Sequence, residues 1–114
     1  PQTEGMWNGS RFGLMKATGY FINIGRGMTT KIDDLADAIE NGVIAGCGLD
    51  VYEIEPLPED HKLWTLENVI LTPHVAVQEA ANVSERMFDL LVENARRFLR
   101  DENLKNVVDK SAWF

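Results

Sequence analysis

The chain has 114 residues, 45% of them hydrophobic and 25% charged, which is the composition of an ordinary globular protein and excludes disordered, collagenous and membrane classes. That length allows one modest core but leaves no room for two full domains. The formal net charge of -7 would repel phosphate backbones and anionic lipids, so we expect neither nucleic acid nor a membrane as a partner.

Several further features bear on location and completeness. Cys47 is the only cysteine, so the chain cannot form an internal disulfide, and a reducing cytoplasm is the expected location. No run of about eighteen apolar residues and no charged-then-apolar leader occurs, which predicts neither a membrane span nor a secretory signal. We expect no metal site. The chain opens with Pro1 rather than methionine, which suggests a piece of something longer.

The first half of the chain alternates helical and strand patterns. Residues 8–16 fit a short helix, and residues 20–24 fit a strand whose apolar residues show little alternation, as in a strand covered on both faces. Apolar positions at helical spacing then predict a second helix that ends at Gly42. Residues 44–51 follow as a buried strand with small side chains.

The second half begins with a predicted loop. Residues 52–67 contain two prolines and five acids, which interrupt every period, and long ordered loops are usually functional. Residues 68–72 form the third predicted strand. One apolar stripe predicts a long helix over residues 78–100, and the mixed tail at 104–114 is expected to dock on something.

This order of elements predicts an α/β fold, specifically half of a doubly wound parallel sheet, because parallel neighbours need crossover connections. Ligands bind at the carboxyl ends of the strands in that architecture. Arg26 lies between two glycines after the first strand, Asp50 and Glu55 follow the second, and His74 follows the third. The sequence therefore predicts a site at this edge of the sheet.

Each of these residues has a plainer interpretation. Arg26 offers a planar donor fork that suits a carboxylate, but it could also be a surface arginine. His74 has the chemistry of an acid/base group, but a lone histidine is often structural. A carboxylate such as Glu55 orients a neighbouring imidazole and favours its charged form, although the loop could be merely solvated. For Glu53 we favour the solvated interpretation.

Three runs resemble the D-isomer-specific 2-hydroxyacid dehydrogenases in order and spacing. The runs are FINIGRG at 21–27, GLDVYEIEPLP at 48–58 and VILTPHVA at 69–76. Leu63-Trp64 and the ending at 106–110 are most similar to the glyoxylate and hydroxypyruvate reductase branch. By this resemblance Arg26 would bind the substrate carboxylate, His74 would exchange a proton with the substrate oxygen, and Glu55 would be the partner of the histidine.

The resemblance also implies a cofactor and partners. Asp50 would bond the nicotinamide carboxamide of NAD or NADP, with Ile24, Gly25 and Ala76 near that ring. Residues 1–78 would be the C-terminal half of the Rossmann-type nucleotide-binding domain, and residues 79–114 would be a helix and tail that return toward a substrate domain. The partners would be a small 2-oxo or 2-hydroxy acid, the upstream part of the same polypeptide and a second copy in a homodimer.

No G-x-G-x-x-G segment occurs in the chain, so the pyrophosphate cradle would lie upstream and the sequence does not distinguish NAD from NADP.

Two other hypotheses stay open. The chain could instead belong to a nucleotide-sensing binding module of the same fold without turnover. It could also fold alone as a structural piece with no activity.

Overall fold

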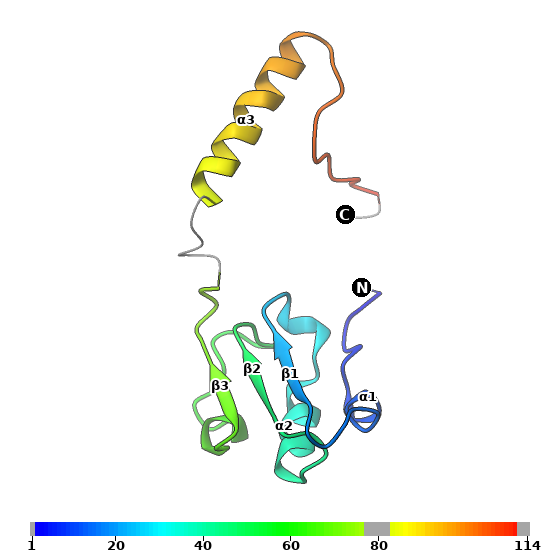
Figure 1. Ribbon diagram of the computed structural model, residues 1–114, viewed down its shortest axis with the longest axis vertical. Coiled ribbons are helices and arrows are strands. Elements are labelled where there is room, and N and C mark those ends of the chain that lie inside the picture. Colours follow the sequence, from blue (N-terminus) through cyan, green and yellow to red (C-terminus); the bar gives the residue numbers. More distant parts are fainter. Residues whose placement is uncertain (1, 77–82, 112–114) are drawn as a thin grey trace. The chain divides into compact units, whose positions relative to one another are not determined.

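The computed structural model describes residues 2–76 and 83–111 of the chain. The contacts divide the chain into two compact units, residues 1–76 and residues 77–114. The ribbon in Figure 1 shows the strands and the shorter helices in the first unit and one long helix in the second.

The first unit is built on a three-stranded parallel sheet, as predicted. Strands β1 (Tyr20–Asn23), β2 (Gly46–Leu49) and β3 (Val69–Leu71) lie in the order β1-β2-β3, with Phe21 opposite Cys47 on the neighbouring strand. Because all three strands run the same way, their carboxyl ends meet at one edge of the sheet (Figure 1).

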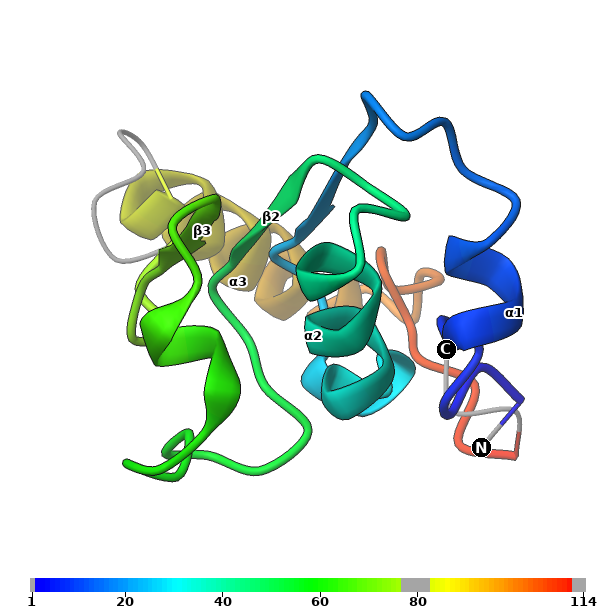
Figure 2. The ribbon, with the colours of Figure 1, turned by 90° about the horizontal axis from the view of Figure 1, so that it is seen from below.

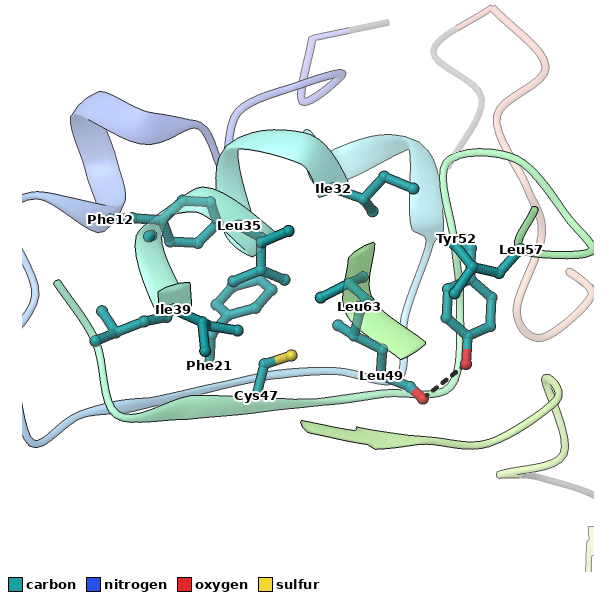
Figure 3. Close-up of a cluster of buried hydrophobic side chains, with 13 residues drawn as sticks. Phe12, Phe21, Ile32, Leu35, Ile39, Cys47, Leu49, Tyr52, Leu57 and Leu63 are labelled. Atoms are coloured by element: carbon teal, nitrogen blue, oxygen red, sulfur yellow. Dashed lines mark hydrogen bonds between the residues drawn. The ribbon is translucent and has the colours of Figure 1, made fainter. Parts of the chain in front are cut away.

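Helix α2 (Ile32–Glu40) supplies the crossover between β1 and β2. Asp33 and Asp34 lie in its first turn, where acidic side chains favour the helix dipole. Its apolar side packs on one face of the sheet, and helix α1 (Gly9–Phe12) lies beside it (Figure 2). Figure 3 shows the resulting core, in which Phe12, Leu35 and Leu63 are almost fully buried.

Two predicted segments differ from the structure in length and content. Helix α1 spans only Gly9–Phe12 rather than residues 8–16, because Gly13 ends it and Leu14 is exposed and gives a longer helix no apolar face to bury. The predicted loop at 52–67 contains a short 3-10 helix, η2 (Lys62–Thr65), and another, η1 (Gly27–Thr29), follows β1.

The expectation that the first strand is covered on both faces is wrong for the described residues. Burial alternates along β1: Phe21 and Asn23 are buried, whereas Tyr20 and Ile22 are 63% and 70% exposed. Ile70 on β3 is likewise 71% exposed. The reason is that α2 and α1 pack on only one side of the sheet within residues 2–76.

The second unit consists of helix α3 (Val83–Leu99) and the tail that follows it. The predicted start near Gln78 lies outside the described residues, as does the end of the predicted tail beyond residue 111. The tail docks on α3 through a reciprocal pair, in which Asn94 donates to the carbonyl of Lys105 at 3.1 Å and accepts from its N–H at 2.8 Å. Within the described residues, α3 and the other helices are too short or too polar to cross a membrane.

Candidate functional site

The turn that carries Arg26 is held by the buried side chain of Asn23. The Asn23 oxygen accepts from the N–H of Gly25 at 3.0 Å, and its amide donates to the carbonyl of Arg26 at 3.2 Å and to Thr30 Oγ1 at 3.0 Å. The Arg26 side chain is exposed and donates to the carbonyl of Gly25 at 2.8 Å. The backbone at Arg26 is therefore fixed, while its guanidinium faces solvent.

Gly27 brings this turn against the loop that follows β2. A Cβ atom at this position would lie 1.8 Å from the carbonyl oxygen of Tyr52, so only glycine fits. Lys31 and Glu53 form an ion pair that joins the same two segments. Glu53 is therefore a surface acid whose partner is Lys31.

Glu55 and His74 form the predicted carboxylate–imidazole pair. Glu55 Oε2 lies 2.8 Å from His74 Nδ1, and Glu55 Oε1 accepts from the N–H of Tyr52 at 3.0 Å. The bond to His74, followed by the bond to Tyr52, lowers the pKa of Glu55 below its usual range. An ionised carboxylate can only accept, so the proton of this bond belongs to Nδ1 and the Nε2 atom of His74 is left for a ligand.

Asp50 is a buried carboxylate that reaches the segment around His74. Its Oδ1 accepts from Thr72 Oγ1 at 2.5 Å and from the N–H of Val75 at 2.9 Å, and its Oδ2 accepts from the N–H of Ala76 at 2.8 Å. The Thr72 hydroxyl, followed by the two backbone N–H groups, lowers the pKa of Asp50. The side chain is therefore ionised at neutral pH although the residue is only 3% exposed.

A cavity of about 360 Å³ adjoins the Glu55–His74 pair. Apart from the pair itself, its walls are mostly apolar and come from the loop after β2 and from the end of β3, namely Tyr52, Pro56, Leu57, Trp64, Leu71, Thr72 and Pro73. The pair thus borders a largely apolar space, where charges and hydrogen bonds act more strongly than in bulk water.

The structure brings some of the predicted site residues into direct contact and others only nearby. Glu55 contacts His74, and Asp50 contacts the backbone N–H of Ala76. Arg26 lies in the turn that Gly27 presses against Tyr52, but within the described residues it forms no hydrogen bond or ion pair with Glu55 or His74.

The remaining predicted residues concern a cofactor or a metal. Ile24 and Gly25, which follow β1, and Ala76, which follows β3, are all exposed. Among residues 2–76 and 83–111, no group of three or more His, Cys, Asp and Glu side chains is arranged to hold a metal ion.

The residues that support the site are Asn23, Gly27, Tyr52 and Thr72, and their supporting roles were not predicted from the sequence. A signal existed for Asn23, because an asparagine side chain commonly bonds the backbone two residues later, which here is the N–H of Gly25. No local signal marked Tyr52 or Thr72, whose hydroxyls bond across 20 and 22 residues of sequence, to the Thr72 carbonyl and to Asp50 respectively.

Comparisons with known proteins give a consistent result. A family model described as "D-isomer specific 2-hydroxyacid dehydrogenase, NAD binding domain" matches residues 1–76. A glyoxylate/hydroxypyruvate reductase A from Photorhabdus laumondii is 42% identical over 109 residues, which cover 96% of this chain and 34% of the relative. The human glyoxylate reductase/hydroxypyruvate reductase is 44% identical over 94 residues, covering 82% of this chain and 28% of the relative.

Solved structures agree with these relatives. A D-isomer specific 2-hydroxyacid dehydrogenase from Xanthobacter autotrophicus, in complex with NADPH and MES, matches with a TM-score of 0.88 and 35% identity, over all of this chain and 46% of that one. An NADPH-dependent glyoxylate/hydroxypyruvate reductase from Sinorhizobium meliloti, in complex with NADP and sulfate, matches with a TM-score of 0.87 and 34% identity, over all of this chain and 37% of that one. The chain spans about a third of the length of the curated relatives it matches.

Proposed function

We propose, since the chain belongs to the family of D-isomer specific 2-hydroxyacid dehydrogenases, that the protein containing it transfers a hydride between NAD or NADP and a small D-2-hydroxy acid or its 2-oxo acid. Glyoxylate and hydroxypyruvate are the proposed substrates, in line with the names of the relatives. The observation that carries the proposal is the 2.8 Å contact between Glu55 and His74 at the same sheet edge as the exposed Arg26.

Arg26 is the proposed carboxylate-binding residue. A 2-oxo acid is an anion, and the chain carries a net charge of -7, so a local cation has to overcome the general repulsion. Among the described residues the guanidinium has one hydrogen bond, to the Gly25 carbonyl, and its other donors could bind a carboxylate and the neighbouring carbonyl oxygen of the substrate.

His74 is the proposed proton donor and acceptor. In the reducing direction, the Nε2 proton moves to the substrate oxygen as the carbonyl carbon gains a hydride, so the C=O bond becomes a CH–OH group. The bond from Nδ1 to Glu55 fixes the plane of the ring and the direction of Nε2. In the oxidising direction the same nitrogen removes the hydroxyl proton.

The end of the sheet also fits part of a nicotinamide cofactor. The exposed Ile24 offers an apolar surface at the strand end. Within the part of the chain that the structure describes, Asp50 Oδ2 accepts one hydrogen bond, which leaves a lone pair for a carboxamide. When bound, the nicotinamide supplies or accepts the hydride. Gly25 and Ala76 have no bulky side chain to obstruct the ring.

The proposal extends to the organisation of the whole protein. Residues 1–78 would complete a nucleotide-binding domain together with an upstream segment that cradles the phosphates, and residues 79–114 would return toward a substrate domain. We further propose a homodimer in the cytoplasm, where the free thiol of Cys47 is stable.

The experiment is a steady-state assay of the intact protein with glyoxylate, hydroxypyruvate and either reduced nicotinamide. We expect turnover, and we expect Arg26→Ala to lower kcat/KM about a hundredfold through loss of a charge-assisted contact to the substrate. Arg11→Ala, an exposed arginine on α1, is the matched control and should retain activity. Tight cofactor binding without turnover of any 2-oxo acid would instead favour a nucleotide-sensing module.

A further inference from the structure

The segment that contains His74 is tied to Asp50 on both sides of the histidine. Thr72, two residues before it, donates its hydroxyl to Asp50, while Val75 and Ala76, directly after it, donate their backbone N–H groups. The three contacts come from 22, 25 and 26 residues further along the chain. A single buried carboxylate at the end of β2 therefore fixes the backbone around the histidine.

His74 adopts a conformation that needs such support. Its φ of 57° lies in the left-handed region, which a residue with a side chain seldom occupies without compensation from its surroundings. Its own N–H donates to the carbonyl of Thr72 at 3.0 Å, and that carbonyl also accepts from the Tyr52 hydroxyl at 2.8 Å. Hydrogen bonds at either side of the turn thus hold the imidazole in one direction.

The partner of His74 is held by the same stretch of chain. Glu55 accepts from the N–H of Tyr52, which is two residues after Asp50. Both members of the carboxylate–imidazole pair are therefore positioned from one short segment at the end of β2, by Asp50 for the histidine and by Tyr52 for the glutamate.

We infer that Asp50 is a positioning residue for His74, which holds the turn at 72–76 so that the imidazole meets Glu55 and presents Nε2 to the substrate. The inference rests on the proposed function and extends it, because it gives Asp50 a role that does not require contact with the cofactor. Acid/base groups lose much of their effect when their geometry slips by about half an ångström, so such support has kinetic consequences.

Isosteric substitutions test this role. Asp50→Asn keeps the size of the side chain but replaces one accepting oxygen with an NH2 group, which cannot accept from an N–H. Thr72→Val removes only the hydroxyl that bonds Asp50, and Thr72→Ser keeps that hydroxyl. Asp60→Asn, in the exposed part of the loop, is the matched control.

The first measurement is NMR on the 114-residue chain, which needs no turnover. The chain has two histidines, so the ring signals of His61 serve as an internal reference for those of His74. We expect Asp50→Asn and Thr72→Val to shift the amide signals of Val75 and Ala76 and the ring signals of His74. Thr72→Ser should restore the wild-type signals of Val75, Ala76 and His74, and Asp60→Asn should leave these three sets of signals unchanged.

The second measurement is kinetic and uses the intact protein. We expect Asp50→Asn and Thr72→Val to lower kcat about tenfold and to move its pH profile, while Thr72→Ser recovers most of the loss. For Thr72→Val we expect the KM of the cofactor to stay within about twofold. Wild-type inactivity together with shifted NMR signals would refute the proposed function but support the positioning role.

Two results would overturn the inference. One is unchanged Val75, Ala76 and His74 signals in both variants. The other is an active protein in which Thr72→Val is silent and Asp50→Asn raises only the KM of the cofactor, since Asp50 would then act on the cofactor alone.

Discussion

Gly27→Ala offers a direct test of how the fold brings Arg26 to the Glu55–His74 pair. The added methyl carbon would lie 1.8 Å from the carbonyl oxygen of Tyr52 and 2.1 Å from its carbonyl carbon, whereas real Cβ contacts essentially never fall below 3.0 Å. The obstacle is backbone, which cannot rotate away as a side chain would. The two loops must therefore separate by about 1.2 Å or more.

That displacement is large on the scale of catalytic geometry. Misplacement by about 1 Å can cost on the order of a hundredfold in rate, so we expect kcat/KM of the intact protein to fall about a hundredfold in Gly27→Ala. The assay is steady-state reduction of glyoxylate, with the melting temperature measured in parallel. Gly9→Ala is the matched control, because its nearest neighbour would lie at 3.7 Å, an ordinary contact distance.

Two results would contradict the prediction for Gly27→Ala. A folded Gly27→Ala protein with activity close to that of Gly9→Ala would show that the spacing between these loops does not position the site. A crystal structure of a folded Gly27→Ala protein reports separately whether the loops move apart. Unchanged loop spacing in that structure would equally contradict the account.

Three further predictions concern the core, the thiol and the pair. Leu35→Ala should lower the free energy of unfolding by about 2–5 kcal/mol in denaturant titrations, whereas Leu14→Ala, at a largely exposed position, should change it little. Burial raises the pKa of Cys47 to about 12, so a thiol reagent at neutral pH should modify it only after unfolding, and fast labelling of the native chain would contradict its burial. The hydrogen bond to His74 lowers the pKa of Glu55, so the stability that Glu55 contributes is present above pH 4.5 and is lost as the pH falls through the lower pKa of the folded state. Glu55→Gln should therefore lose less stability on acidification than wild type. Parallel loss of stability in the two proteins during acid titration would contradict this.

The sheet could be predicted because its signals are local. Each strand is a short apolar run, and the helix between the first two carries its apolar residues at helical spacing. Parallel order then follows from the crossover that the helix provides. Coverage of the sheet could not be predicted, because Tyr20 and Ile22 have the same apolar character whether or not a helix packs on them.

The candidate site was predictable at its reactive residues and not at their supports. Glu55 and His74 could be paired in advance, because both follow neighbouring strands and the family resemblance links them. The burial of Asp50 against Val75 and Ala76 depends on how a turn folds 25 residues later, and no local pattern encodes that. Glu53 shows the same limit, since its partner Lys31 lies 22 residues away.

A crystal structure of the intact protein with a nicotinamide cofactor and oxamate, an unreactive analogue of a 2-oxo acid, would test the roles proposed for Arg26 and His74. We expect the oxamate carboxylate to lie on the guanidinium of Arg26 and the oxamate carbonyl oxygen to lie within hydrogen-bond distance of His74 Nε2, with the contact between Glu55 and His74 retained. Oxamate bound away from both residues, with the cofactor in place, would contradict these roles.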